Sequence, residues 1–180
     1  EDVLTFPIQW IPENWNVVEN YKEVWTGSMP FLLLYCNSIK VTVLTTLVSC
    51  TISCLAGYGF AKISFKGRDF IFVIVLATFM IPPQTLLVTQ FLLYRWLGLY
   101  DTHTGLILLN SFSVFGTFML RQFYLGISNE IIESARMDGA GHFRIFTSIC
   151  LPLVRPAIAT YAILRFIWTW NDFQNPLIFL

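Results

Sequence analysis

The chain has 180 residues, of which 56% are hydrophobic and only 12% are charged, and its formal net charge is zero. Soluble domains usually carry about 25% charged residues, so this composition points to lipid as the main solvent of the folded chain. The zero net charge gives no electrostatic reason to expect a nucleic-acid partner.

The first 29 residues predict a polar segment that precedes the membrane domain. They hold five acidic residues against one lysine, and the stretch FPIQWIPENWNVVENYKEVW carries three tryptophans and a tyrosine. We expect an extracytoplasmic segment with a short helix at the lipid headgroups, with ligand binding as the alternative. The abrupt polar start and the end within the apolar run PLIFL suggest that spans are missing at both ends.

Four apolar runs predict membrane-spanning helices within residues 30–180. Val41–Ala61 has 21 residues without a charge, Phe70–Tyr94 has 25 and Thr104–Leu120 has 17, while Pro156–Leu180 contains two charged residues. At about 1.5 Å per residue, the first two exceed the roughly 30 Å hydrocarbon core of a bilayer. The sequence therefore predicts an all-α, polytopic helical membrane protein, and a large soluble helical core is the alternative.

A proline pair interrupts the second run. Pro83 lacks a backbone donor and Pro82 disfavours helical angles in the residue before it, so we expect this span to kink or break there. Such a break is tolerated in lipid where protein or water satisfies the freed carbonyl groups.

Basic residues alternate between the loops, which predicts the topology. Residues 62–69 hold three basic side chains against one acid, and residues 121–155 hold four arginines. By the positive-inside rule, both segments lie in the cytoplasm, whereas residues 1–29 and 95–103 lie outside.

The cytoplasmic segment at about residues 125–156 predicts two short helices. Ser128 is a suitable N-cap, and Gly139 suits the left-handed position after the first helix. A second helix starts near His142, with apolar residues at helical spacing: Phe143, Phe146, Ile149 and Cys150. These apolar faces predict either a protein partner or packing against the ends of the chain's own spans.

Within this segment, Glu133, Ala135 and Gly139, followed after fixed spacings by Ile149, Leu151 and Pro152, resemble the EAA loop of ATP-binding-cassette (ABC) importer permeases. Ser134 replaces the more usual alanine, and Asp138-Gly139-Ala140 also resembles the family. The resemblance implies a coupling helix that docks in a groove of a cytoplasmic ATPase. It assigns this role to Glu133, Ser134, Ala135, Asp138, Gly139, Ala140, Ile149, Leu151 and Pro152.

Other stretches resemble the carbohydrate-importer branch of the family: Asn37-Ser38, FAKISFKGR, Ile81-Pro82, LGLYDTHTGLIL and WTWNDFQNPL. The resemblance implies a type I ABC importer transmembrane domain with four of a usual six spans, in a bacterial or archaeal cell membrane. It further implies a second permease subunit, a cytoplasmic ABC ATPase dimer and an extracytoplasmic solute-binding protein. ATP and magnesium would bind the ATPase, and no cofactor would bind this chain.

The last run contains Arg165 and Asp172, which are seven residues apart and would share one face of a continuous helix. Ionisable residues within a membrane are functional candidates, because they are costly to insert. We therefore expect a translocation pathway lined by Arg165, Trp168, Asn171, Asp172 and Asn175. The alternative is that Asn171 and Asp172 only join helices near the outer interface.

No sequence motif of catalysis is present, including G-x-x-x-x-G-K-[ST], G-x-S-x-G and H-E-x-x-H, so we expect a non-enzymatic subunit. The four cysteines are expected to be small buried residues rather than a disulfide or a metal site. The alternatives are an importer permease for another solute, such as an amino acid or a phosphate ester, a secondary transporter and a polytopic membrane enzyme.

Overall fold

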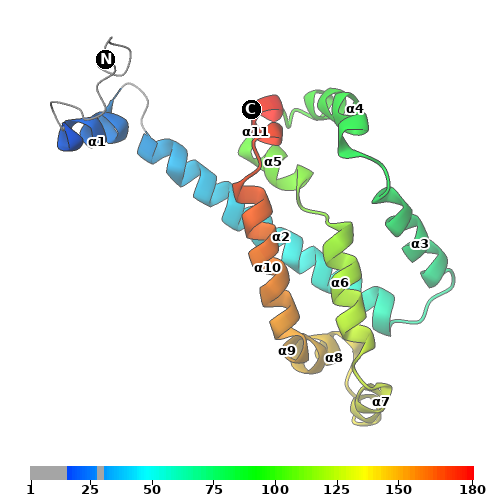
Figure 1. The fold of residues 1–180 in the computed structure, drawn as a ribbon. Coiled ribbons are helices and arrows are strands. Elements are labelled where there is room, and N and C mark those ends of the chain that lie inside the picture. The colour runs from blue at the N-terminus through cyan, green and yellow to red at the C-terminus, as the bar shows by residue number, and fades with distance from the viewer. Residues whose placement is uncertain (1–15, 28–30) are drawn as a thin grey trace, which may run out of the picture. The chain divides into compact units, whose positions relative to one another are not determined.

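The computed structural model describes residues 16–27 and 31–180, and in those residues the regular structure is helical, without a strand. The chain divides into two compact units, residues 1–39 and 40–180. Figure 1 shows the helices in chain order. Their bounds are α1 Val17–Thr26, α2 Phe31–Lys62, α3 Arg68–Thr78, α4 Pro83–Trp96, α5 His103–Leu109, α6 Val114–Leu125, α7 Asn129–Met137, α8 His142–Ile145, the π-helix η2 Phe146–Cys150, α9 Leu151–Leu153, α10 Arg155–Trp170 and α11 Gln174–Phe179.

The first unit contains the predicted short helix of the N-terminal segment. Helix α1 buries none of its side chains. Val17, Tyr21, Val24 and Trp25 follow helical spacing and are all exposed, which suits a helix that lies along a lipid interface. The other two tryptophans of this segment, Trp10 and Trp15, lie outside the described residues.

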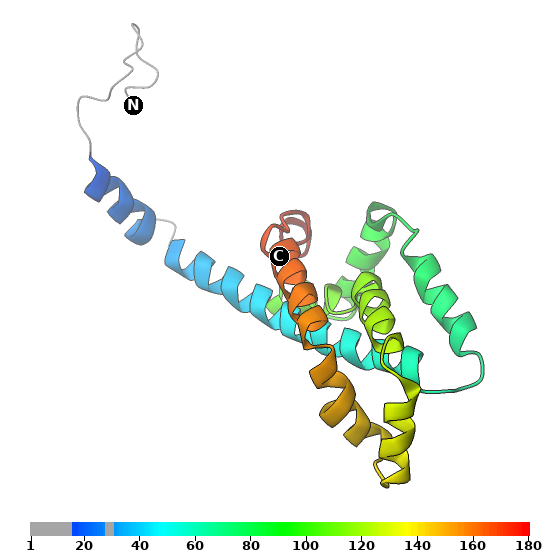
Figure 2. The same cartoon turned by 60° about the horizontal axis from the view of Figure 1, so that its bottom comes forward.

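Helix α2 is long and apolar enough to cross a membrane by itself. Its second-unit part, residues 40–62, presents a stripe of buried hydroxyl side chains to the other helices: Thr42, Thr45, Thr46, Ser49 and Ser53. Figures 1 and 2 both show α6 and α10 lying against this part of α2. The three helices form the centre of the second unit.

The predicted break at Pro82-Pro83 is confirmed. Helix α3 ends at Thr78, α4 begins at Pro83, and the two are bent by 96°. Pro82 adopts an extended ψ of 128° and Pro83 occupies the first helical position, where its missing N–H has no cost.

The predicted span Thr104–Leu120 lies within a pair of helices that passes as a span, but it is not one continuous helix. It is divided into α5 and α6, which are bent by 49°. The Ser111 hydroxyl donates to the carbonyl of Ile107 at 2.6 Å, and the Ser113 hydroxyl accepts from the amide of Gly116 at 3.0 Å. These side chains compete with the helical backbone pattern and cap a new helix instead.

The last predicted span, Pro156–Leu180, is also shorter than expected. Helix α10 ends at Trp170, and a turn precedes α11. By length and composition, α10 qualifies as a span only together with the segment His142–Leu153, from which it is bent by 76°. One helix and three such bent pairs thus give up to four spans in the described part of the chain.

The hydrophobic core joins the bundle to the predicted cytoplasmic loop. Ile132 of α7 and Ile145 of α8 pack in the same cluster as residues of α2, α6 and α10. The rest of the cluster consists of Cys54, Tyr58, Ala61, Leu120, Tyr124, Phe146, Cys150, Val154, Ala157 and Tyr161.

Candidate functional site

The predicted coupling helix is α7, and both of its ends are capped as its sequence indicates. The Ser128 hydroxyl accepts from the amide of Glu130 at 3.2 Å. At the other end, Gly139 adopts a φ of +81°. The amide of Ala140 donates to the carbonyl of Ala135, and that of Gly139 donates to the carbonyl of Arg136, both at 2.9 Å. This pair of bonds is a Schellman motif, so Gly139 sets the angle at which the chain leaves α7.

The last turns of α2 form hydrogen bonds with both arms of this loop, that is, with the segment that begins α7 and the segment that begins α8. The Lys62 ammonium donates to the carbonyl of Ile127 at 2.7 Å and to the side-chain oxygen of Asn129 at 2.9 Å. The Tyr58 hydroxyl donates to the carbonyl of His142 at 3.2 Å. One helix therefore holds the start of α7 and the start of α8.

The two arms of the loop each have a buried and an exposed apolar face. Ile132, Ile145 and Phe146 pack on the bundle, whereas Met137 is 89% exposed and Phe143 is 77% exposed. Packing against the chain's own helices is therefore confirmed for the buried residues, whereas a protein partner for Met137 and Phe143 stays a prediction. Of the apolar residues predicted at helical spacing, Phe143 is exposed, Phe146 and Cys150 are buried, and Ile149 is half-buried.

The predicted coupling residues divide in the same way. Glu133, Ser134, Asp138 and Gly139 are exposed, and Ala135, Ala140 and Leu151 pack partly against the core. Ile149 and Pro152 are half-buried. A shallow pocket of about 270 Å³ lies between the two arms and is lined by Ala135, Asp138, Ala140, Arg144, Ser148 and Ile149. The loop thus presents a continuous mixed polar and apolar surface.

Replacing Lys62 with methionine should loosen the start of α7. The variant loses charge-assisted hydrogen bonds, which contribute about 1.5–3 kcal/mol each, while its aliphatic stem still packs. Amide exchange in the first turn of α7 should rise roughly tenfold or more in hydrogen-exchange measurements. Lys66→Met, at an exposed lysine of the neighbouring turn, is the matched control and should leave this exchange unchanged. Unchanged exchange in Lys62→Met would rule out the anchoring role.

The predicted pathway residues lie at the other end of the bundle, around α5, α10 and α11 (Figure 1). Arg165 donates to the backbone carbonyl of Asn110. The Asn110 side chain donates to the Asp172 carboxylate at 3.5 Å, and the Asn175 side chain donates to the same carboxylate oxygen at 2.7 Å. Arg165, Asp172 and Asn175 therefore meet at one point, through Asn110.

The helical argument for this meeting is wrong, because Asp172 lies beyond the end of α10. The Asn171 side chain folds back onto the carbonyl of Ile167 at 2.8 Å, and the Asp172 carboxylate accepts from the amide of Asn175 at 3.2 Å. Both side chains bond locally in ways that end one helix and begin the next. Asn171 and Trp168 are exposed and take no part in the cluster, and Trp168 instead contacts the Phe115 ring.

Sequence reasoning missed three residues that organise the molecule. Among residues 16–27 and 31–180, only Asn110 bonds both Arg165 and Asp172, and its polar side chain within an apolar run was the available signal. Lys62 was interpreted only as a topological charge. Tyr161 joins α10 to α2 through its hydroxyl, 2.8 Å from that of Ser49 and 3.4 Å from that of Ser53, and no sequence pattern indicates this.

Residues 50–179 match the family described as "Binding-protein-dependent transport system inner membrane component". The chain belongs to this family. The match covers the helix breaks, the predicted coupling loop and the cluster of Asn110, Arg165, Asp172 and Asn175, called the outer cluster below, so the described geometry is that of a family member.

Individual relatives agree with the family match. The arabinooligosaccharides transport system permease protein AraQ of Bacillus subtilis is 38% identical over 90% of this chain and 58% of its own length. The sn-glycerol-3-phosphate transport system permease protein UgpE of Yersinia pestis is 32% identical over 89% of the chain and 59% of its own length. The chain thus spans somewhat more than half the length of these curated relatives.

A solved structure has the same fold. It is described as a bacterial ABC transporter involved in the import of the acidic polysaccharide alginate. The similarity has a TM-score of 0.75 at 29% sequence identity, and it covers 81% of this chain and 52% of the other. The sequence-based expectation of an ABC importer permease fold is confirmed, and the family is one of non-catalytic membrane components.

Proposed function

We propose that this chain is the permease subunit of an ATP-driven, binding-protein-dependent importer of sugars or oligosaccharides. The observation that carries the proposal is the coupling loop, whose α7 is capped, fastened to α2 and exposed along one face. Relatives named for arabinooligosaccharide transport and alginate import support the sugar class. A phosphate ester is the second candidate solute, since one relative is named for glycerol phosphate and the half-buried Arg165 is a suitable phosphate ligand.

The proposed complex contains a second permease subunit, an ABC ATPase dimer in the cytoplasm and a solute-binding protein outside. ATP and magnesium bind the ATPase, and this chain provides the docking surface: Glu133, Ser134, Ala135, Asp138, Gly139, Ala140, Ile149, Leu151 and Pro152. The complex is located in a bacterial or archaeal cell membrane, which the chain crosses several times. Residues 1–29 lie outside, and residues 125–156 lie in the cytoplasm.

The coupling role is tested by the Gly139→Val variant. A β-branched residue at a φ of +81° is strained, at a cost on the order of 1–3 kcal/mol, so α7 should leave its docking angle. Uptake of arabinooligosaccharides and solute-stimulated ATP hydrolysis by the purified complex should fall together, by roughly 5- to 150-fold.

Two variants serve as controls for this experiment. Gly141 has a φ of −71° and open space around it, so Gly141→Val should transport normally. Asparagine tolerates the left-handed region, so Gly139→Asn should retain most of the uptake. Normal uptake by Gly139→Val would contradict the proposed coupling role.

We propose that Arg165, Asp172 and Asn175 of the outer cluster, together with the exposed side chains of Trp168 and Asn171, line the translocation pathway. An Asp172→Asn variant keeps the shape of the side chain but removes its charge. If the carboxylate binds solute hydroxyl groups, the KM for uptake should rise about 10- to 150-fold, as expected for the loss of a charge-assisted bond of about 1.5–3 kcal/mol. The matched control is Asp101→Asn, on an exposed aspartate of the same end. A stability loss with an unchanged KM would instead assign Asp172 to helix joining.

A further inference from the structure

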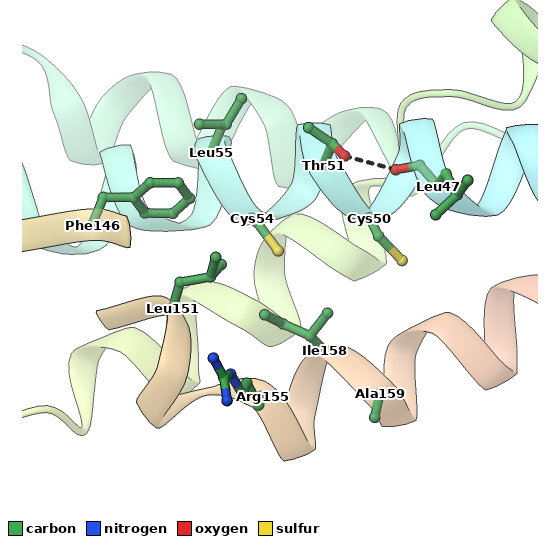
Figure 3. A pocket seen from close by; sticks show the side chains of 10 residues that line it. All are labelled: Leu47, Cys50, Thr51, Cys54, Leu55, Phe146, Leu151, Arg155, Ile158 and Ala159. Atoms are coloured by element: carbon green, nitrogen blue, oxygen red, sulfur yellow. Dashed lines mark hydrogen bonds between the residues drawn. The ribbon is translucent and has the colours of Figure 1, made fainter. Parts of the chain in front are cut away.

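A groove of about 460 Å³ in the second unit has no role in the coupling loop or in the outer cluster (Figure 3). One wall is α2 and the other walls are η2, α9 and the start of α10. The lining residues are Leu47, Cys50, Thr51, Cys54, Leu55, Phe146, Leu151, Arg155, Ile158 and Ala159. On α2 they follow one helical face over two turns, or about 12 Å, which suits a chain-like ligand.

The uncharged residues in the walls of the groove offer almost no hydrogen-bonding groups to water. The Thr51 hydroxyl donates to the carbonyl of Leu47 at 2.8 Å, so its hydrogen-bonding capacity is used within α2 (Figure 3). The Cys50 and Cys54 thiols are weak hydrogen-bonding groups, and the other uncharged side chains are apolar. Apolar cavities do not hold ordered water, so the groove suits an apolar occupant such as a lipid chain.

Arg155 is the charged residue of the groove. Its guanidinium makes no hydrogen bond or ion pair with the rest of the described chain, and no acidic residue lines the groove. It also lies in the first turn of α10, where the positive end of the helix dipole disfavours a cation. A bound anion would be stabilised by both positive charges, as at basic sites for lipid headgroups between membrane helices.

We propose that this groove binds an anionic phospholipid, with an acyl chain along α2 and its phosphate on Arg155. The groove supplies affinity for any acyl chain through its apolar walls, whereas Arg155 supplies the preference for an anionic headgroup. The proposal requires only that the chain lies in a membrane, and it is independent of the transported solute.

The test uses the purified full-length complex after exchange into a mixture of phosphatidylglycerol and phosphatidylethanolamine with identical acyl chains. Native mass spectrometry then counts retained lipids of each kind. We expect phosphatidylglycerol to be retained at least fivefold over phosphatidylethanolamine, and Arg155→Gln to lower this ratio to about one. Arg144→Gln, at another exposed arginine of the same loop, should leave the ratio unchanged. Equal ratios in the original complex and in Arg155→Gln would overturn the proposal.

A second pair of variants tests the acyl-chain groove itself. Ala159→Trp should fill the groove and reduce the retention of both lipids, whereas Ile163→Trp, at an exposed position on the same helix outside the groove, should not. A photo-crosslinking residue at position 159 should attach to phospholipid in the intact complex. Crosslinking to another polypeptide of the complex would mean that a protein subunit covers the groove, and the proposal would be wrong.

Discussion

Gly116→Val is expected to prevent the bundle from assembling. A Cβ atom at position 116 would lie 2.6 Å from the Ser53 hydroxyl and closer still to the Tyr161 ring, so α6 could not keep its contact with α2 and α10. Overpacking costs about 1–3 kcal/mol or more, and breaking the buried bond between Tyr161 and Ser49 adds about 1–3 kcal/mol. A summed loss of roughly 2–6 kcal/mol is a large part of the stability of a typical domain.

The measurement is the fraction of folded protein after extraction in detergent, followed on heating. Gly59→Ala is the matched control, because Gly59 is also helical but a Cβ there would meet open space. That variant should be as stable as the original or slightly more so, by up to about 1 kcal/mol. If Gly116→Val melts at the same temperature as Gly59→Ala, the close packing at Tyr161 is not required for the fold.

The double variant Met137→Asp with Phe143→Asp is expected to separate the chain from the ATPase that we propose as its partner. Both side chains are almost fully exposed, so the fold of this chain should not change. Burying such a side chain in a partner contributes about 1.5–3 kcal/mol. Replacing both with aspartate should therefore weaken ATPase binding by at least 100-fold. Uptake should fall with it, while membrane insertion is retained.

ATPase retention during purification of the complex is the readout. Trp96→Asp is the control, since Trp96 is 82% exposed and lies in the outer half of the predicted topology. This control should retain the ATPase fully. Retention of the ATPase by the double variant would show that α7 and α8 do not dock through these side chains.

Much of this fold could be predicted, because several local signals have only one structural solution. Pro82-Pro83 cannot continue a helix, Gly139 suits a left-handed residue, and Ser128 caps a helix wherever one begins nearby. Helix α7, which begins after Ser128 and ends before Gly139, was therefore predicted together with its caps. The coupling role assigned to it stays a prediction.

What could not be predicted depends on competition between side chains and backbone. Asn110 and Asp172 look like polar positions on continuous helices, but their side chains bond at the breaks between helices. Apolar periodicity does not indicate whether such a polar residue lies within a continuous helix or ends the helix through a side-chain hydrogen bond. The division of the predicted coupling loop into buried and exposed faces also required the structure, because helical spacing alone does not indicate which side of a short helix packs on the bundle.

The fastening of both arms of the loop to α2 has a mechanical consequence. Because Lys62 and Tyr58 hydrogen-bond to the loop, we expect the loop and residues 40–62 of α2 to move as one rigid body. That stretch is about 35 Å long, so a tilt of about 5° at the ATPase end would displace the far end by roughly 3 Å. A small push on α7 would thus be amplified into a movement wide enough to admit or exclude a water molecule across the bilayer. The stiffness of these three hydrogen bonds, rather than the distance that the proposed ATPase moves, would then limit how faithfully each movement is transmitted.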